Sequence, residues 1–290
     1  MSSVRRSILV GVISVVIPAH NEERVLGRLL QALSVGPAQE PLEVLVVCNG
    51  CTDGTARLAA SFPGVRVVQT PEPSKRKALR LADEHVTGFP RLYVDADVEL
   101  GHQDVLSLAL ALSEGPVLAA APRRTVPRDR AGLAVRCYYD VWEELPNVRS
   151  GIFGRGVVAL SEEGHRRISR LPLLLSDDLA MSSAFTDAER RIVPEATVIV
   201  RPPRTWRALL RRRIRAATGT LQAYAGDNGL RTDSRTTKTD LLRVVRRRPA
   251  LALRMPVFLA TAVLASRGAA RAHRRRDEDT WLRDDTSRED

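Results

Sequence analysis

Aromatic residues and cysteines are both scarce in this sequence of 290 residues. Phe, Trp and Tyr together make up 4% of the chain, which argues against recognition of nucleic acid by stacked bases. Three cysteines, an odd and low number, argue against a disulfide framework and suit a reducing compartment. Cys48 and Cys51 form a C-x-x-C pair, but the sequence offers no second Cys or His pair to complete a zinc site. We interpret them as small residues at a strand end, with a redox pair as the alternative.

The sequence also lacks a signal-peptide cleavage site and a long uncharged apolar run. Arg5 and Arg6 precede an apolar stretch over residues 8–17, but Ile17-Pro18-Ala19 has the wrong residue at its first position for cleavage. In the C-terminal third, the longest uncharged stretch is residues 255–266, or 12 residues, whereas a spanning helix needs about 20. We therefore expect a cytoplasmic chain that does not cross a membrane.

Positive charge is concentrated near the C-terminus. Residues 201–276 carry 20 Lys and Arg against three Asp and Glu, so the other residues hold −6 of the net charge of +11. Such asymmetry indicates an anionic partner, which is a phosphate-bearing ligand, a membrane surface or nucleic acid. We expect this segment to bind the anionic inner face of a membrane peripherally, and packing on the catalytic domain is the alternative. No nucleic-acid-binding module is visible, so we expect no nucleic acid as a partner.

Strands and helices are predicted to alternate along the first 120 residues. Apolar runs rich in β-branched residues predict strands over residues 13–17, 42–47, 65–68, 91–94 and 117–120. Helical patterns separate them over residues 22–33, from about Thr52-Asp53, over 74–86 and over about 104–112. This alternation predicts an α/β fold, with a mostly parallel sheet covered by helices on both faces.

Polar residues follow three of these predicted strands. His20-Asn21-Glu22 follow the first strand, Asn49-Gly50 and Asp53-Gly54 the second, and Asp95-Ala96-Asp97 the fourth. Ligands of such sheets bind beyond the carboxyl ends of the strands, so we expect these clusters to converge. Asp95 and Asp97 offer oxygen ligands to Mn²⁺ or Mg²⁺, which would neutralise a diphosphate leaving group. A solvated acidic turn is the alternative.

Three motifs together resemble the family 2 glycosyltransferases of GT-A fold. They are VVIPAHNE at residues 15–22, CNGCTDGT at 48–55 and DAD at 95–97, and the resemblance extends over about residues 13–225. It implies a GT-A-like domain over residues 8–225, which a basic helical extension (226–276) and a polar tail (277–290) follow. It also implies inverting transfer of a sugar from a nucleoside diphosphate donor to a saccharide or lipid-linked acceptor.

The resemblance also assigns substrate contacts. In the family the first two motifs hold the nucleoside, and the corresponding residues here are Pro18, Ala19, Asn21, Glu22, Asn49 and Asp53. Many members have Asp where this chain has Asn49, which leaves uracil, guanine and thymine as candidate bases. Lys77 and Asp95 correspond to positions near the diphosphate, and a solvated helix face is the alternative for Lys77.

Two downstream segments extend the resemblance. Leu175-Ser176-Asp177-Asp178-Leu179 is similar to the acid pair that carries the family's base, which implies Asp178 as base and Asp177 as its support. A helix N-cap with a first-turn acid is the alternative. Residues 211–219 are similar to a Q-x-x-R-W element and align Arg215 with its Arg, although Gln and Trp are absent, which argues against a processive polymerase. A basic solvated helix is the alternative.

Two other functional classes and one aromatic cluster also bear on the function. A sugar nucleotidyltransferase would normally carry a Gly-rich basic loop after the first strand, where this chain has residues 18–22, PAHNE. A basic nucleic-acid-binding protein would leave the acidic strand ends unexplained. Tyr138, Tyr139 and Trp142 form the densest aromatic cluster, which suits either stacking of an acceptor sugar or packing in a core.

Overall fold

The computed structural model describes residues 11–36, 42–170, 181–182, 184–225 and 236–275, and the chain divides into two compact units. The first unit combines Met1–Thr125 with Ile152–Val200, and the second combines Val126–Gly151 with Arg201–Asp290. Helix α9 (Trp206–Ala225) belongs to the second unit, where it packs against helix α11 (Met255–Arg275).

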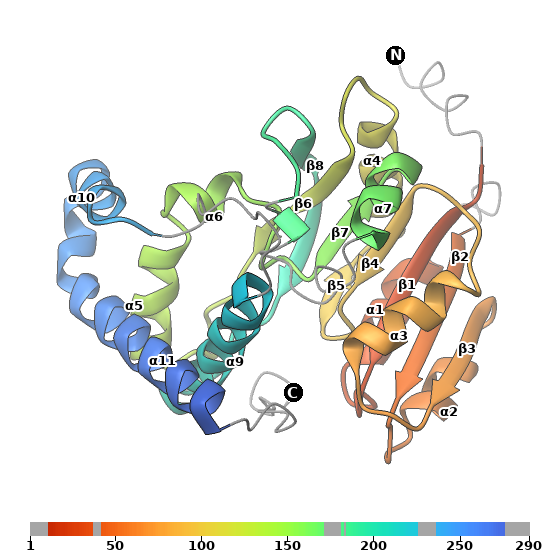
Figure 1. Ribbon diagram of the computed structural model, residues 1–290, viewed down its shortest axis with the longest axis horizontal. Helices are drawn as coiled ribbons and strands as arrows, with labels where there is room; N and C mark the ends of the chain where they lie inside the picture. The colour runs from red at the N-terminus through yellow and green to blue at the C-terminus, as the bar shows by residue number, and fades with distance from the viewer. Residues whose placement is uncertain (1–10, 37–41, 171–180, 183, 226–235, 276–290) are drawn as a thin grey trace. The chain divides into compact units, whose positions relative to one another are not determined.

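An eight-stranded sheet forms the centre of the first unit, with the strand order β3-β2-β1-β4-β7-β6-β8-β5 (Figure 1). β1 is parallel to both β2 and β4, β2 to β3, and β6 to β8, whereas β7 is antiparallel to β4 and β6, and β5 to β8. The expected α/β fold with a mostly parallel sheet is confirmed. The strands are β1 (Ile13–Ala19), β2 (Leu42–Asn49), β3 (Val65–Thr70), β4 (Arg91–Val94), β5 (Val98–Leu100), β6 (Ala119–Thr125), β7 (Val157–Leu160) and β8 (Arg190–Val200).

Helices cover this sheet because its central strands bury both of their faces. Along β1, Val15 and Ile17 are fully buried in one apolar cluster with residues of α1 and α4, and Val16 is fully buried outside that cluster. α3 packs against β1 and β2, where its Leu79 is also buried. The helices of this unit are α1 (Leu26–Ser34), α2 (Thr55–Ala60), α3 (Lys75–Asp83), α4 (His102–Leu112) and α7 (Glu162–Ser169).

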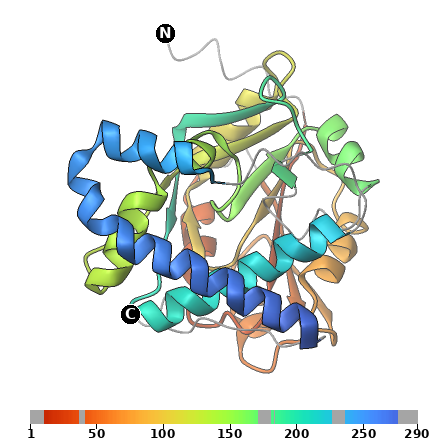
Figure 2. The same cartoon turned by 60° about the vertical axis from the view of Figure 1, so that its left-hand side comes forward.

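The second unit is helical and has an aromatic core. The Tyr138 ring lies edge-on to that of Tyr139 and stacks on that of Phe258, with centroids 5.5 Å and 5.3 Å apart, and Trp142 lies edge-on to Tyr139. All four rings are buried, so the cluster is core packing and not an exposed stacking surface. Figures 1 and 2 show α9 and α11 side by side. The remaining elements are α5 (Leu133–Trp142), α6 (Pro146–Ser150), α10 (Lys238–Arg247) and the 3₁₀ helix η3 (Pro249–Arg254).

The last helical segment, Pro249–Ala272, is long and apolar enough to cross a membrane by length and composition. The expectation that this region is too short to span was based on residues 255–266, and it is corrected here. Within residues 249–266 the single charged residue is Arg254, and Arg267 and Arg271 follow before the segment ends. Core helices of globular proteins meet the same criterion, but only 22% of the most apolar part of this segment is buried.

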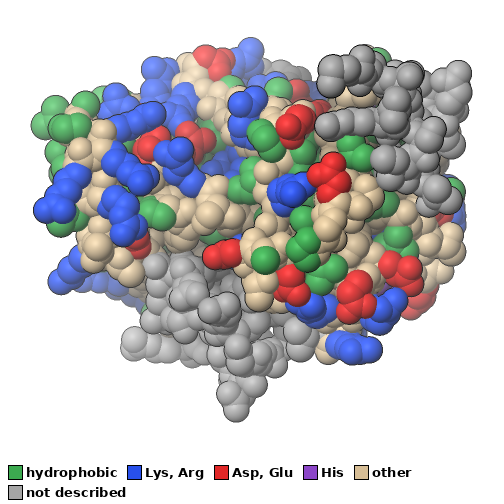
Figure 3. Space-filling view, turned by 90° about the horizontal axis from the view of Figure 1, so that it is seen from above, with side chains coloured by type: hydrophobic (Ala, Val, Ile, Leu, Met, Phe, Trp, Pro, Cys, Tyr) green, Lys and Arg blue, Asp and Glu red, His purple; other side chains and the backbone are tan. Residues whose placement is uncertain are grey.

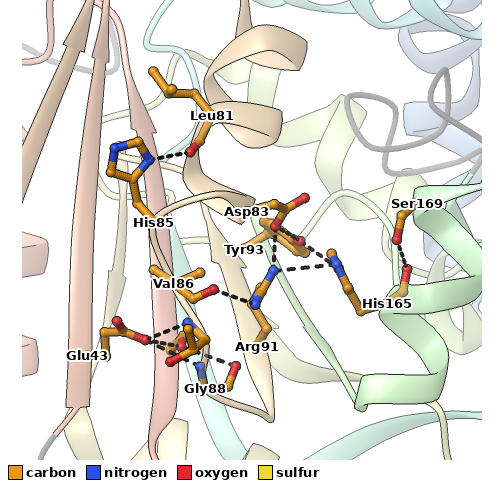
Figure 4. Close-up of polar contacts among 12 residues, drawn as sticks. Glu43, Leu81, Asp83, His85, Val86, Gly88, Arg91, Tyr93, His165 and Ser169 are labelled. Atoms are coloured by element: carbon orange, nitrogen blue, oxygen red, sulfur yellow. Dashed lines mark hydrogen bonds and ion pairs between the residues drawn. The ribbon is translucent and has the colours of Figure 1, made fainter.

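A buried polar ring joins α3, β4 and α7 in the first unit (Figure 4). Arg91 donates to Asp83 Oδ1 over 2.7 Å and to the Val86 carbonyl over 2.9 Å. The Tyr93 hydroxyl donates to Asp83 Oδ1 over 2.8 Å and lies 3.0 Å from Nδ1 of His165, whose Nε2 is 3.4 Å from the Arg91 guanidinium. Because a guanidinium only donates, Nε2 accepts and Nδ1 carries the proton. The ring therefore fits a neutral imidazole.

We predict that this ring makes the stability of the fold depend on pH below about 6.5. Burial lowers the pKa of His165 from its usual 6.5, and the charge of Arg91 acts in the same direction, although Asp83 opposes them. Below pH 6.5 the unfolded chain binds a proton at His165 more readily than the folded chain does. The free energy of unfolding should therefore fall as the pH drops through 6.5. Urea unfolding at a series of pH values measures this.

The matched variants are His165→Gln and His85→Gln. His85 lies outside the ring, and its Nδ1 lies 2.8 Å from the Leu81 carbonyl oxygen (Figure 4). His165→Gln should flatten the pH dependence and His85→Gln should retain it. An unchanged slope in His165→Gln would contradict the assignment.

Candidate active site

The carboxyl ends of β1, β2 and β4 lie at one edge of the sheet, because the three strands are parallel neighbours. Ala19 at the end of β1 is in register with Cys48 near the end of β2, and Val16 is in register with Tyr93 on β4. A small pocket at this edge is lined by Pro18 and Asp95, among other residues. The three strand ends that the predicted polar clusters follow therefore lie at the same edge of the sheet.

Side chains join the loop after β1 to the end of β2. Asn49 is 1% exposed, and its amide donates to the Ala19 carbonyl over 2.9 Å. Asn21 has a φ of +54°, a left-handed conformation that Asn tolerates better than most residues. Its Oδ1 accepts a hydrogen bond from the Thr52 backbone amide over 2.7 Å. These contacts hold the two loops together as one polar surface.

The next residues of the same two loops are joined through Thr55. Its hydroxyl accepts from the Glu22 backbone amide over 2.7 Å and donates to Asp53 Oδ1 over 2.5 Å. Asp53 Oδ1 also accepts from the Thr55 backbone amide over 3.0 Å, at the start of α2. Asp53 thus supports the first turn of this helix, and Glu22 is buried beside it. Of the six predicted nucleoside residues, Asn21, Glu22 and Asp53 lie in these loops, and Pro18, Ala19 and Asn49 are the last residues of β1 and β2.

Asp95 is paired with a lysine that sequence reasoning missed. Lys75 Nζ lies 2.6 Å from Asp95 Oδ1, and both side chains line the small pocket. The predicted Lys77 is exposed and pairs with Glu72 instead. A signal for Lys75 existed, because it directly follows the cap residue Ser74. Side chains at a helix N-terminus point back towards the preceding loop.

Gly156 leaves room for the carboxylate of Asp95. The Asp95 backbone amide donates to the Gly156 carbonyl over 2.7 Å, and Gly156 has a φ of +66°. A Cβ atom added there would lie 3.3 Å from Asp95 Oδ2 and 2.6 Å from a methyl group of Val98. Asp97 follows in the turn between β4 and β5 and is half-buried. The turn with both acids is thus held against the start of β7.

This turn offers a metal ion two carboxylates, those of Asp95 and Asp97. Among the residues that the structure describes, no group of three or more His, Cys, Asp and Glu side chains is arranged to hold a metal. In this structure the Lys75 ammonium contacts Asp95, so the turn already holds a positive charge beside its carboxylates. Oxygen donors of this kind fit Mg²⁺ or Mn²⁺, which usually takes further oxygens from substrate phosphates.

The other predicted site residues lie elsewhere. Asp177 and Asp178 fall outside the described residues. Arg215 is an exposed residue of α9 in the second unit.

Polar loops beyond the carboxyl ends of parallel strands form the ligand-binding edge of open α/β sheets. Residues 14–156, which extend from β1 to the start of β7, match the profile of glycosyl transferase family 2. This part of the chain belongs to that family.

One curated relative is the 4,4'-diaponeurosporenoate glycosyltransferase of Staphylococcus aureus. It is 27% identical over 197 residues, which cover 60% of this chain and 51% of that protein. The chain therefore spans about half the length of the curated relatives it matches.

Two solved structures are similar to this one in fold. A mannosyltransferase from Pyrobaculum calidifontis, in complex with GDP-Man and Mn²⁺, has a TM-score of 0.54 at 22% identity, with 94% of this chain and 84% of that chain covered. The glucosyl-3-phosphoglycerate synthase of Mycobacterium tuberculosis, with Mn²⁺, UDP-Glc and phosphoglyceric acid, has a TM-score of 0.51 at 20% identity, with 74% and 80% covered. At this identity they establish the GT-A fold.

We predict that Gly156→Ala destabilises the protein more than Gly115→Ala. Both glycines have a left-handed φ, +66° and +65°, so each substitution should cost about 1–2 kcal/mol in backbone strain. Only Gly156→Ala also crowds Asp95 and Val98, since an added Cβ at Gly115 meets nothing within 4 Å. The extra crowding should cost about 1–3 kcal/mol. Denaturant unfolding compares the two, and equal losses would contradict the close approach.

Proposed function

We propose that the chain is a glycosyltransferase, which moves a sugar from a nucleoside diphosphate donor to an acceptor hydroxyl with inversion at the anomeric carbon. The observation that carries this proposal is the single polar surface formed by the loops after β1 and β2 beside the acids that follow β4. Family membership of residues 14–156 supports the same activity. It also favours a glycosyltransferase over a sugar nucleotidyltransferase or a nucleic-acid-binding protein.

The proposed donor site runs along the sheet edge. The joined loops, which include Asn21 and Asn49, hold the nucleoside, and Lys75 lies where it faces the diphosphate. The solved structures similar in fold contain GDP-Man or UDP-Glc, which supports a sugar linked to GDP or UDP. A thermal-shift series with UDP, GDP and dTDP would identify the base.

Asp95 and Asp97 would hold a divalent cation, Mn²⁺ or Mg²⁺, together with the diphosphate. When bound, such an ion stabilises the negative charge that develops on the leaving group. The two half-buried carboxylates can bind the ion without further protein ligands if phosphate oxygens complete its coordination. Mn²⁺ in both solved structures supports this choice of ion.

Asp178 is the proposed general base, and Asp177 its support. The base takes the proton of the acceptor hydroxyl as its oxygen attacks the anomeric carbon and the nucleoside diphosphate leaves from the opposite side. A single displacement of this kind inverts the configuration. The acceptor is a saccharide or a lipid-linked molecule, with Arg215 as a further contact to acceptor or diphosphate.

Asp97→Asn should remove the metal dependence of nucleoside diphosphate binding. The wild type should bind UDP or GDP at least about tenfold more tightly with Mn²⁺ than with EDTA, which is about 1.4 kcal/mol. Titration calorimetry measures both affinities. Glu84→Gln removes an exposed carboxylate of the same unit and should leave the Mn²⁺ effect intact. Equal affinities of the wild type under both conditions would exclude the metal role.

Asp178→Asn should lower turnover by about 10²–10⁴, the usual effect of losing a general base, while donor binding survives. Asp177→Asn should lower turnover less. Normal turnover of Asp178→Asn with the true acceptor would place the base elsewhere, whereas lost nucleotide binding would indicate a folding defect.

We further propose that the second unit binds the cytoplasmic face of an anionic membrane peripherally. One face of α11 packs on α5 and α9 through residues such as Phe258 and Ala265. The opposite face exposes Leu259, Val263 and Leu264 to between 39% and 47%, and Leu253 in η3 is 89% exposed. A helix with apolar side chains on its outer face suits the headgroup boundary of a bilayer.

Basic residues surround this apolar face. Arg254 precedes it, and Arg267 and Arg271 follow it on exposed positions of α11. Figure 3 shows many Lys and Arg side chains on the left of the view, the side on which α10 lies in Figure 1. Each such residue near an anionic leaflet contributes on the order of 1 kcal/mol. The arrangement supports reversible binding by charge and shallow insertion.

Val263→Asp should weaken co-sedimentation of the full chain with phosphatidylglycerol vesicles at low salt. A charge on the outer face opposes insertion, whereas Val35→Asp, at a position 74% exposed in the first unit, should have no effect. Point variants are preferable to truncation before α11, because removing that helix uncovers α5 and α9. Equal binding of both variants, or no binding by the wild type, would contradict the membrane proposal.

A further inference from the structure

An ion pair occupies the small pocket at the edge of the sheet. Lys75 Nζ lies 2.6 Å from Asp95 Oδ1, and the two side chains are 28% and 34% exposed. Of the described residues that line this pocket, the charged ones are these two, and most of the others are apolar, such as Leu79 and Val157. Attraction between opposite charges is stronger in such surroundings than in water. The pair is therefore a partly buried contact and not a fully solvated one.

Both carboxylate oxygens of Asp95 have close neighbours. Oδ1 contacts the Lys75 ammonium, and Oδ2 lies beside Gly156, where an added Cβ would be 3.3 Å from it. The Asp95 backbone amide donates to the Gly156 carbonyl over 2.7 Å, which holds the turn in place. A divalent cation that binds Asp95 through Oδ1 would therefore meet the ammonium at the same oxygen.

The position of Lys75 in α3 does not by itself favour a cation. Ser74 caps this helix, so Lys75 is its first residue, and the first turn contains no acidic residue. Positive charge is unfavourable at a helix N-terminus because the helix dipole is positive there. The contact with Asp95 offsets this effect, and another anion in the pocket would offset it equally well. Lys75 can therefore exchange one anionic partner for another.

We propose that Lys75 excludes free divalent cations from Asp95 in the nucleotide-free protein, and that the diphosphate of the donor releases Asp95 by taking over the ammonium. Asp95 then accepts the cation together with the nucleotide and not before it. The exclusion of the free ion rests on the ion pair alone, whereas the release of Asp95 rests on the proposed function.

Competition of two cations for one carboxylate makes the binding of nucleotide and metal cooperative. In the free protein, Mn²⁺ must displace Lys75 from Asp95, whereas with a nucleotide bound the ammonium has phosphate oxygens as partners. The factor by which the nucleotide strengthens Mn²⁺ binding equals the factor by which Mn²⁺ strengthens nucleotide binding, because linkage is reciprocal. Lys75 contributes to this factor in addition to direct contact between the ion and the phosphates.

The experiment titrates the full chain with Mn²⁺ alone and follows the free ion by electron paramagnetic resonance. Lys75→Met removes the ammonium and should bind Mn²⁺ on the order of tenfold more tightly than the wild type, within the usual range for coupled sites. Lys75→Arg keeps the charge and should bind Mn²⁺ less tightly than Lys75→Met. Lys77→Met is the matched control, because it removes the same charge from the same turn at an exposed residue that pairs with Glu72. It should keep the wild-type affinity for Mn²⁺.

Asp95→Asn, added to Lys75→Met, should abolish the gain in Mn²⁺ affinity, because the gained ion binds at Asp95. A gain that survives Asp95→Asn, an equal gain in Lys77→Met, or no gain in Lys75→Met would overturn the proposal.

Calorimetry with UDP or GDP separates this proposal from the proposed function. The factor by which Mn²⁺ strengthens nucleotide binding should be smaller in Lys75→Met than in the wild type and Lys77→Met. If the nucleotide binds and this factor is the same in all three, the release of Asp95 by the diphosphate is wrong and the proposed function stands. If no nucleotide binds, the proposed function fails, while the titration with Mn²⁺ alone still decides whether Lys75 excludes the ion.

Discussion

β1 lies between β2 and β4 and runs parallel to both, and the candidate site depends on this pairing. Parallel neighbours end at the same edge, so the residues that follow them along the chain meet in space without any long loop. Fully buried side chains such as Val15 and Val16, on opposite faces of β1, hold the strand from both sides. A register shift of one residue would exchange these faces, so the same packing that stabilises the sheet also fixes where the loops begin.

Beyond the strand ends, hydrogen bonds take over from apolar packing. The Asn49 amide donates to the Ala19 carbonyl, and the Thr55 hydroxyl accepts from the Glu22 backbone amide. Burial of the Asn49 amide nitrogen and the Thr55 hydroxyl is tolerated because the neighbouring loop supplies their partners. The result is a surface of short polar side chains whose shape is set before any ligand arrives. Preorganisation of this kind lowers the entropy cost of binding.

The first half of the sheet could be predicted from the sequence because its strands are continuous apolar runs. Residues 91–94 were expected as a strand, and β4 has those bounds. The later strands lack that signal. β5 has three residues, and Pro194 and Glu195 interrupt the pattern of β8, where the pairing of β6 with β8 shifts register. Such strands form because the neighbouring strands supply partners for their backbone hydrogen bonds.

Within the site, the sequence predicted clusters better than individual contacts. Asn21, Asn49 and Asp95 were expected at one edge and lie there. The choice between Lys75 and Lys77 depends on which side of α3 faces the sheet edge, which residue type alone does not decide. Gly156 could not be assigned to Asp95, because the two are far apart in sequence and meet only through the antiparallel pairing of β4 with β7. His165 sits in a polar helix, and only the fold shows that it is half-buried among polar partners.

The interleaved course of the chain has a consequence for synthesis on the ribosome. α5 is made before β7 and β8, yet its Tyr138 stacks on Phe258, and its Asp140 pairs with Arg254, 114 residues further on. All eight strands of the sheet precede residue 201, so the sheet can close while α5 still lacks its cover. Until α11 emerges, an aromatic helix face remains open to solvent in the nascent chain. Chains that are truncated within the last helices would therefore combine a folded sheet with an incomplete helical unit whose aromatic side chains are exposed.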